Sequence, residues 1–579
     1  MTSLFTYLKK YSWMYLIAIL SMIISVSLDM LSPQLTRIMI DDVIIAGNAG
    51  LFLSLLLGMA GIGIGRCIFQ YIKEYLFDKS GSQIATEMRI ELFEHIQSLS
   101  ADFFDKNNTG ELMARVKDDI DRIWEALTFI IMLTIEVVIH TGIVLFCMYR
   151  IDVRLAILPT LLMVISAGIA LVMERKLGIV YEEISEENAV LNTVAEENLA
   201  GVRTVKAFAR EKHEIEKFLS HNKRFYDLNM KQSKIFVTYY PYFQLITRLL
   251  PLLILLGGGY LAILGQLSLG SLGAFVAYSM NIVWPMEMLG WLSNGISAAV
   301  ASNRKIRQIY AQKPTITEPL NPITPETIKG EISFTHVCYE SLDGHKILSD
   351  IDFHVSAGST IGIMGATGAG KSTIVNLLQR LYDTSCGFIS IDGIDIKQLP
   401  LEILRGNISV VMQDVFLFSD TINENIKLGK KETMDEETIM SSAYRARANE
   451  FIERMEEQYE TIIGERGIGL SGGQKQRISI ARALAKRNPI LVMDDSTSAL
   501  DTETEHQIWK NLQTLQNTTK VIIAHRISAV RNADEIIFLE NGCIVERGTH
   551  SELMELRGLY YETYQAQYNG GFQFSNQIN

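Results

Sequence analysis

The segment GATGAGKST, residues 365–373, has the residue types and the spacing of a phosphate-binding loop. It follows an apolar, strand-like stretch and precedes a stretch with helical periodicity, which is the context that the G-x-x-x-x-G-K-[ST] pattern requires. Glycines let backbone N–H groups close around phosphate oxygens at the start of a helix. We expect Lys371 to reach the β- and γ-phosphates and Ser372 to bind Mg²⁺. The expected nucleotide contacts are Gly365, Thr367, Gly368, Ala369, Gly370, Lys371, Ser372 and Thr373.

Two adjacent acids, Asp494 and Asp495, end the apolar run of LVMDDSTSALD, residues 491–501. The run predicts a buried strand, which would place Asp494 to hold Mg²⁺ through water. Asp495 then lies where a general base would act on an attacking water molecule. The two acids therefore indicate a nucleotide-hydrolysing site.

Three more residues fit the same site. Tyr339 lies upstream, where its aromatic face could stack on adenine. Gln413, in VVMQD, could sense the metal and the γ-phosphate, and His525, in VIIAHR, could contact the γ-phosphate. Taken singly, each has an ordinary alternative: Tyr339 as a core residue, Gln413 and His525 as local hydrogen-bond partners.

The segment LSGGQKQR, residues 470–477, completes the set. With it, the chain resembles ATP-binding cassette (ABC) transporters, specifically exporter half-transporters that carry the membrane domain first. The resemblance spans essentially all 579 residues. The motifs, in family order, are Tyr339, GATGAGKST, Gln413, GERG (464–467), LSGGQ (470–474), LVMDD, SALD (498–501) and His525.

The resemblance implies a dimer that sandwiches two ATP molecules between two cassettes. Each ATP would lie between the phosphate loop of one subunit and the LSGGQ segment of the other, and Asp501 would face the other cassette. Closure of the cassettes would then switch the membrane helices from inward- to outward-facing. The implied contacts with the second ATP are Ser471, Gly472, Gly473 and Gln474; the implied Mg²⁺ ligands are Ser372, Gln413 and Asp494; the implied catalytic residues are Asp495, His525 and Gln413.

Asp495 departs from the family pattern, which has a glutamate at this position. The shorter arm moves the carboxylate, and a misplacement of about 1 Å can cost ~10²-fold in rate. One interpretation is a slower but working base. The one we prefer is that this chain contributes the degenerate site of a heterodimeric exporter. A homodimeric lipid or peptide exporter with slow ATPase activity, or a mainly ATP-binding regulatory subunit, is the alternative.

The N-terminal half contains apolar segments of about the length that spans a bilayer. Between the second and third spans, residues 79–122 carry six Lys/Arg, and residues 174–235 carry eleven, whereas the opposite loops carry Arg37, Arg150 and Arg154. Because positive charge stays cytoplasmic, both termini and the nucleotide-binding half are expected inside a cell membrane, bacterial in type. The long loops keep helical periodicity, so they are expected to extend the spans into the cytoplasm. The expected spans are 13–32, 51–72, 125–148, 155–173, 242–264 and 271–293.

Ionisable residues interrupt the expected spans. Such residues pair between helices or reach the interface, or else they line a substrate path, and both interpretations stay open here. The cargo is not readable from the sequence, although export of amphiphilic small molecules is the family's commonest assignment. The residues concerned are Arg66, Glu136, His140, Arg248 and Glu287.

Four prolines cluster in QKPTITEPLNPITPET and predict a linker. The expected organisation is a transmembrane domain over 1–310 with two intracellular coupling loops, a linker over 311–329 and an ATP-binding cassette over 330–579. The fold expected is an α-helical membrane domain of six transmembrane helices with long cytoplasmic extensions. An α/β P-loop cassette domain with a helical subdomain would follow it.

Charge and cysteine content exclude other classes. The net charge of -12 argues against a nucleic-acid binder. The five cysteines, Cys67, Cys147, Cys338, Cys386 and Cys543, have no CxxC pair and fit neither a disulfide framework nor a zinc site. We therefore expect unpaired, buried or incidental thiols in a reducing compartment.

Overall fold

The computed structural model describes residues 4–341, 343–429 and 434–568. The chain folds as two compact units. One contains residues Met1–Ser98 and Asn108–Lys313, and the other contains Leu99–Asn107 and Pro314–Asn579. The short segment Leu99–Asn107 thus packs with the C-terminal half of the chain, although the sequence places it between two membrane helices.

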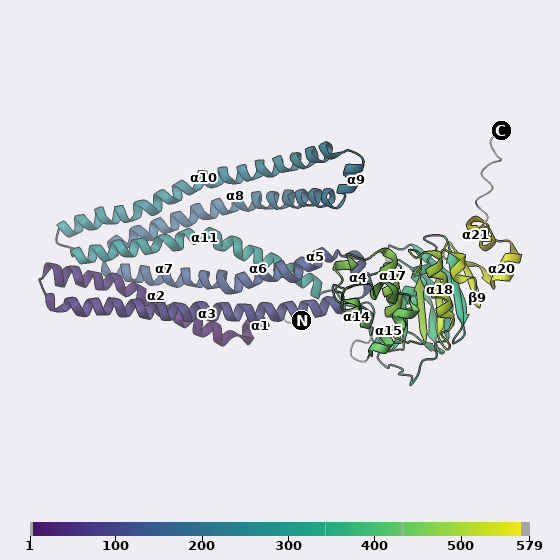
Figure 1. The fold of residues 1–579 in the computed structure, drawn as a ribbon. Helices are drawn as coiled ribbons and strands as arrows, with labels where there is room; N and C mark the ends of the chain where they lie inside the picture. Colours follow the sequence, from purple (N-terminus) through teal and green to yellow (C-terminus); the bar gives the residue numbers. More distant parts are fainter. Residues whose placement is uncertain (1–3, 342, 430–433, 569–579) are drawn as a thin grey trace. The chain divides into compact units, whose positions relative to one another are not determined.

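The first unit consists of helices only (Figure 1). α8 and α10 run side by side and are joined through the short α9. Three π-helical segments, Met39–Ile45, Arg115–Asp119 and Ala126–Ile130, continue or join α-helices. The helices are α1 (Leu4–Lys10), α2 (Ser12–Ile38), α3 (Phe52–Ser98), α5 (Thr109–Ala114), α6 (Ile120–Glu125), α7 (Ile131–Ile151), α8 (Val153–Ala200), α9 (Val202–Ala207), α10 (Glu211–Ile263) and α11 (Leu269–Tyr310).

Among the described residues, five helical stretches are long and apolar enough to cross a membrane. They contain the first four expected spans and the fifth, 242–264, up to Ile263, and most run far beyond them as helix, as the periodicity of the loops predicts. The sixth expected span, 271–293, lies within the continuous helix α11, some of whose side chains fall outside the described set. The five stretches are Ser12–Ile45, Ala49–Ser98, Thr109–Ile151, Val153–Ala200 and Glu211–Ile263.

Three of the ionisable residues in the spans have partners on neighbouring helices. Arg66 of α3 pairs with Asp29 of α2. Glu136 of α7 accepts a 2.9 Å hydrogen bond from Lys73 of α3, whose side chain is only 1% exposed. The ring of His140 lies 3.2 Å from the carbonyl oxygen of Asn281.

The other two ionisable residues of the expected spans are Arg248 and Glu287. Arg248 approaches Gln244 one turn earlier on α10, with its Nε 3.5 Å from the side-chain oxygen. The side chain of Glu287 lies outside the described residues. Interhelical pairing therefore accounts for Arg66, Glu136 and His140, although the same three residues also line a cavity of about 430 Å³.

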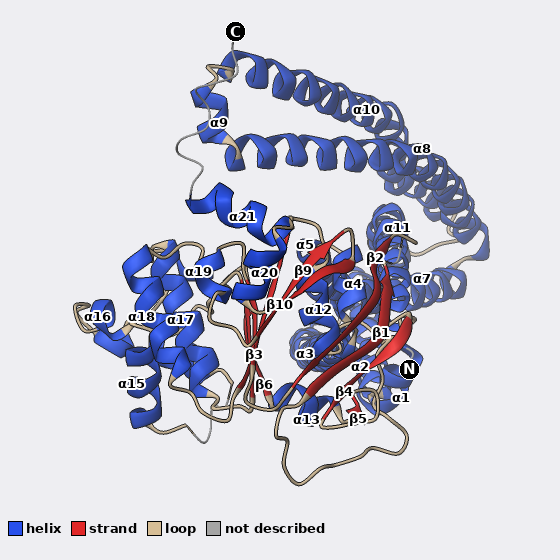
Figure 2. Ribbon diagram, turned by 90° about the vertical axis from the view of Figure 1, so that its right-hand side faces the viewer, coloured by secondary structure: helices blue, strands red, loops and turns tan. Residues whose placement is uncertain are grey.

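The second unit contains two sheets (Figure 2). A six-stranded sheet has the order β10-β9-β3-β8-β7-β6, parallel except for the β10–β9 pair, and an antiparallel sheet has the order β2-β1-β4-β5. The strands are β1 (Ile332–Glu340), β2 (Lys346–Val355), β3 (Thr360–Gly365), β4 (Cys386–Ile391), β5 (Ile394–Asp395), β6 (Ile408–Val411), β7 (Ile490–Asp494), β8 (Thr519–Ile523), β9 (Glu535–Glu540) and β10 (Cys543–Gly548).

Helices of the second unit cover the parallel sheet, and three of them form a separate group. α15, α16 and α17 gather on one side of the parallel sheet, away from β1, β2, β4 and β5 (Figure 2). β7 is buried along its whole length because both faces of a parallel sheet are covered. The helices are α4 (Ala101–Lys106), α12 (Lys371–Leu378), α13 (Leu401–Gly406), α14 (Ile422–Lys427), α15 (Glu436–Arg445), α16 (Asn449–Ile452), α17 (Gly472–Ala485), α18 (Thr502–Gln513), α19 (Ile527–Val530), α20 (His550–Leu556) and α21 (Leu559–Tyr568).

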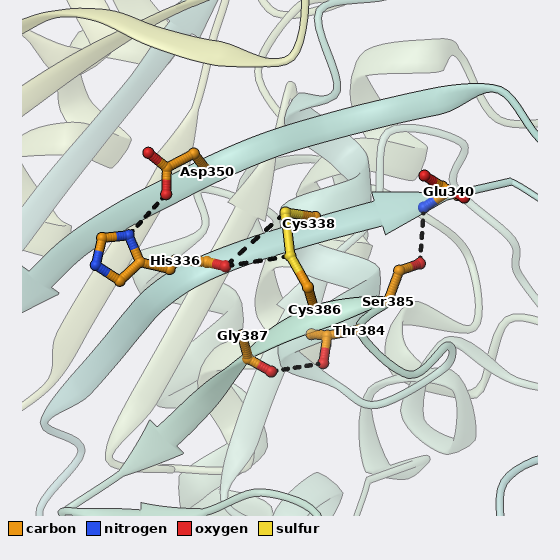
Figure 3. The surroundings of a disulfide bond; sticks show 8 residues. All are labelled: His336, Cys338, Glu340, Asp350, Thr384, Ser385, Cys386 and Gly387. Carbon is orange, nitrogen blue, oxygen red and sulfur yellow. Dashed lines mark hydrogen bonds and ion pairs between the residues drawn. A yellow bond between two sulfur atoms is a disulfide. The ribbon is translucent and has the colours of Figure 1, made fainter.

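One expectation about the cysteines is wrong. Cys338 and Cys386 form a disulfide across 48 residues of sequence, with their Cα atoms 4.9 Å apart (Figure 3). The antiparallel register places the two residues directly opposite each other on β1 and β4. Sequence spacing could not show this pairing, since it depends on which strands become neighbours. Cys67, Cys147 and Cys543 are free thiols.

Candidate nucleotide-binding site

The predicted site residues follow the carboxyl ends of neighbouring parallel strands. In the register of the sheet, Ile523 of β8 pairs with Ile363 of β3 on one side and with Asp494 of β7 on the other. The phosphate loop, the two acids and His525 therefore start from one edge of the sheet. Ligands of open α/β sheets bind outside this edge.

The phosphate loop has the backbone that only glycine adopts easily. Gly365, Gly368 and Gly370 have φ angles of 146°, 84° and 96°. A Cβ atom on Gly365 would lie 2.2 Å from the carbonyl oxygen of Leu539, and one on Gly370 would lie 2.5 Å from Leu348 Cδ2. The loop thus closes tightly against the sheet and leads into α12, whose first N–H groups suit an anion.

Lys371 begins α12 and is 6% exposed. Its ammonium donates 2.8 Å hydrogen bonds to the carbonyl oxygens of Gly365 and Ala366, which holds it across the loop. Burial lowers the pKa of Lys371, and the charges of Asp494 and Asp495 oppose that shift. The side chain is a positive charge fixed where phosphate oxygens would lie.

Asp494 and Ser372 are brought together. The Ser372 hydroxyl lies close enough to the buried Asp494 carboxylate to favour its charged form. Burial raises the pKa of Asp494, while the Ser372 hydroxyl and the charge of Lys371 act in the opposite direction. A hydroxyl and a carboxylate oxygen, completed by phosphate oxygens and water, are the hard ligands that Mg²⁺ takes. Among the described residues, no group of three or more His, Cys, Asp or Glu side chains could hold a metal ion.

Asp495 lies half-buried directly after β7 and has a left-handed backbone, with φ 43°. Its N–H donates to the carbonyl oxygen of Ile523 at 2.9 Å, and its own carbonyl accepts from the Ser498 hydroxyl at 3.0 Å. Aspartate adopts this backbone region more readily than longer side chains do. The backbone of Asp495 is therefore fixed from two sides.

His525 and Gln413 complete the edge. The carbonyl oxygen of His525 accepts a 2.6 Å hydrogen bond from Gln567 of α21, which also accepts from the N–H of Ile527 at 3.0 Å. Gln413 is exposed, two residues beyond the end of β6. α21 thus anchors the backbone that follows the histidine, from the carbonyl of His525 to the N–H of Ile527.

The segment after Gln413 is attached to the helical subdomain through Arg482 of α17, which the sequence analysis did not single out. Its guanidinium donates to the carbonyl oxygens of Asn425 at 2.7 Å and Phe416 at 2.9 Å. Burial lowers the pKa of Arg482 to about 10. Movement of the Gln413 segment is thereby tied to movement of α17.

Ser471 and Gln474 lie at the start of α17, where they cap the helix. The Ser471 hydroxyl accepts from the N–H of Gln474, and the Gln474 side chain accepts from the N–H of Ser471 at 2.8 Å. Asp501 caps α18 in the same way, by accepting from the N–H of Thr504 at 2.9 Å. Gly472 and Gly473 form the first turn of α17. The contact of Ser471, Gly472, Gly473 and Gln474 with a second ATP stays a prediction.

Tyr339 lies on β1 against a second tyrosine that sequence reasoning missed. The rings of Tyr339 and Tyr382 are 5.7 Å apart, and the Tyr382 hydroxyl donates a 2.6 Å hydrogen bond to Asp105 of α4. Burial raises the pKa of Tyr339 and the pKa of Tyr382. The hydrogen bond to Asp105 raises the pKa of Tyr382 further. Tyr382 follows α12 without any motif, so only the fold reveals it.

Replacing Tyr382 with phenylalanine tests this connection. The ring contact with Tyr339 is kept, and only the hydrogen bond to Asp105 is lost. We expect basal ATP hydrolysis to change less than twofold, while stimulation of hydrolysis by transported compounds falls severalfold, because α4 would transmit less of the cassette's motion. Hydrolysis measured with and without cargo checks this; full stimulation in the variant would contradict it.

Comparisons with known proteins identify the family of the chain. The family model described as the ABC transporter transmembrane region matches residues 15–286, and the one described as ABC transporter matches residues 348–498. The chain is 35% identical to "Uncharacterized ABC transporter ATP-binding protein YwjA" of Bacillus subtilis, over 97% of this chain and 98% of that protein. It is 34% identical to "Putative multidrug export ATP-binding/permease protein YgaD" of the same organism, over 96% and 97%.

A solved structure extends the likeness to three dimensions. The structure of a bacterial Atm1-family ABC exporter with ATP bound matches with a TM-score of 0.81 and 28% identity, over 97% of this chain and 98% of that one. The predicted family and fold are confirmed, and the chain is a multi-pass membrane protein. It belongs to the ABC transporters, as an exporter whose N-terminal transmembrane domain is fused to its ATP-binding domain.

Proposed function

We propose that this chain is one subunit of a heterodimeric, ATP-driven exporter of amphiphilic small molecules, and that its own nucleotide site binds ATP firmly but hydrolyses it slowly. The observation that carries the proposal is Asp495, a shortened carboxylate at the position of the general base. The intact LSGGQ segment of this chain would complete the nucleotide site of the partner. We expect the partner to have a glutamate at the position that corresponds to Asp495.

We assign a proposed role to each residue of this chain's own site. The loop N–H groups and Lys371 would bind the phosphates, and Tyr339 would stack on adenine. Ser372 and Asp494, with Gln413, would hold Mg²⁺, which neutralises phosphate charge when bound. Asp495 would orient the attacking water and accept its proton, while His525 would contact the γ-phosphate. The backbone of Asp495 is held by Ile523 and Ser498, so it cannot easily advance to replace the missing methylene.

The connection between α8 and α10 supports a two-chain assembly. No residue of α9 is buried, and the flanking side chains of Leu199 and Phe208 are 75% and 74% exposed. Large apolar side chains exposed at both ends of α9 would be buried by a partner surface. In the proposed dimer they would pack against the cassette of the partner, just as Leu99–Asn107 packs within the unit that contains this chain's own cassette.

The membrane unit supports an amphiphilic cargo. The cavity of about 430 Å³ is lined by Phe129, Met132 and Trp284 as well as by the charged pairs of Arg66 and Lys73. A lining in which charged and polar side chains are as prominent as apolar ones suits molecules that have both an apolar body and a polar group. We place the cassette and both termini in the cytoplasm, because the positive residues of the long loops lie on that side.

The test is to express the chain alone and with a half-transporter encoded beside it. We expect the pair to hydrolyse ATP and to lower the cellular accumulation of a fluorescent amphiphile, whereas the chain alone does neither appreciably. Full hydrolysis and transport by the isolated chain would exclude the heterodimer and favour a homodimeric lipid or peptide exporter. Transport by the partner alone would favour a regulatory role.

A further inference from the structure

Two cysteines are placed for thiol–disulfide chemistry beside the adenine-side tyrosine. Cys338 directly precedes Tyr339 on β1. Cys386 is the first residue of β4 and lies opposite Cys338, with 4.9 Å between the Cα atoms of the two cysteines. That separation lies within the range in which a disulfide forms without moving the backbone. Cys386 is exposed and Cys338 is partly exposed, so reagents in solution reach the pair.

The strand pairing is irregular at this point. Between Thr335 and Cys338 the register of β1 against β4 shifts, and Gly387 turns with φ 68° against the carbonyl of His336. Beyond the shift, the N–H of Ser385 donates to the carbonyl of Cys338 at 2.9 Å. A bulge of this kind interrupts the ladder and lets a strand end adjust. The two sulfur atoms bridge the strands directly beyond this register shift.

The cross-link also connects the two chain segments that carry Tyr339 and Tyr382. Tyr339 follows Cys338 at once, and Tyr382 lies four residues before Cys386. On the Cys386 side, the Ser385 hydroxyl accepts from the N–H of Glu340 at 2.9 Å (Figure 3). A disulfide therefore fixes the strand end that carries Tyr339 relative to the segment that carries Tyr382.

We propose that Cys338 and Cys386 are a reversible redox modification site that sets the affinity of this chain's nucleotide site, the oxidised form binding adenine nucleotides more tightly. The proposal rests on the proposed function, in which Tyr339 stacks on adenine and the cassette faces a reducing cytoplasm. In such a compartment, disulfides are chiefly transient and redox-sensing. The cross-link orders the adenine platform before binding, so less freedom is lost when the nucleotide binds.

The oxidant is a peroxide and the reductant is a dithiol. One thiolate attacks a peroxide oxygen, which breaks the O–O bond and leaves a sulfenic acid and, after protonation, water. The second thiol attacks the sulfenic sulfur and releases a second water, so two electrons pass from the sulfur pair to H₂O₂. A dithiol returns two electrons and two protons through a mixed disulfide and is itself oxidised to a disulfide.

The test measures binding of β,γ-methylene-ATP to the full chain after treatment with H₂O₂ or with dithiothreitol. We expect about three- to tenfold tighter binding by the oxidised protein. Inorganic tripolyphosphate, which has no adenine, should bind equally to both forms. Differential alkylation of the thiols followed by mass spectrometry reports the Cys338–Cys386 bond directly.

Matched variants separate this pair from general oxidation. Cys338→Ser and Cys386→Ser should bind the analogue equally under both treatments, whereas Cys543→Ser, which removes another exposed thiol of the cassette, should keep the full response. Equal or weaker binding by the oxidised wild-type chain overturns the redox proposal while leaving the nucleotide site intact. No binding under either condition overturns both the redox proposal and the proposed nucleotide site.

Discussion

Replacing Asp495 with glutamate is expected to raise ATP hydrolysis at this chain's own site by about 10²-fold, because the longer arm brings the carboxylate within hydrogen-bond reach of the attacking water. The backbone at Asp495 has φ 43°, which aspartate tolerates better than glutamate. We therefore also expect a modest loss of stability, up to about 1 kcal/mol. Single-turnover hydrolysis by the assembled pair measures the rate, and thermal unfolding measures the loss of stability.

The matched control is Asp495→Asn, which keeps the short side chain and the preference for this backbone but removes the base. We expect hydrolysis at this site to fall below the wild-type rate while ATP binding is retained. If Asp495→Glu and wild type hydrolyse ATP equally, arm length does not limit this site, and the proposal of a degenerate subunit loses its main support.

The sequence was sufficient to predict the elements that have strict local rules. A phosphate loop needs glycines at fixed offsets between a strand and a helix, and residues 365–373 have them. The strand ending at Asp494 is a short, wholly apolar run, as buried parallel strands are. The long segments beyond the expected spans keep a 3.6-residue period, so their continuation as α3, α8 and α10 could also be predicted.

Other features depend on which strands and helices become neighbours. Tyr382 and Asp105 are far apart in sequence, and their hydrogen bond exists only because Leu99–Asn107 packs with the C-terminal half of the chain. Cys338 and Cys386 were expected to be unpaired since no spacing rule joins them. The capping role of Ser471 follows a local pattern, since a glutamine stands three residues later, and the expected contact of the same residues with a second ATP stays a prediction.

Lys371→Met should have the second large effect. The ammonium of Lys371 is the buried positive charge of the phosphate loop, and removing a preorganised charge that stabilises developing negative charge typically costs ~10²–10³ in rate. We expect ATP hydrolysis by the assembled transporter to fall at least 10²-fold at this site. Binding of the triphosphate should weaken in parallel, because Lys371 also contacts the ground-state phosphates.

A loss of activity could also arise from misfolding, and Lys520 on β8 offers a close control. Its ammonium is likewise buried and donates to two backbone carbonyls, those of Leu515 at 3.0 Å and Thr518 at 3.2 Å. Leaving buried carbonyls unsatisfied costs about 1–3 kcal/mol each, so Lys371→Met and Lys520→Met should lower thermal stability similarly. Only Lys371→Met should weaken nucleotide binding. Equal loss of binding in both variants would show that Lys371 acts through stability rather than through the phosphates.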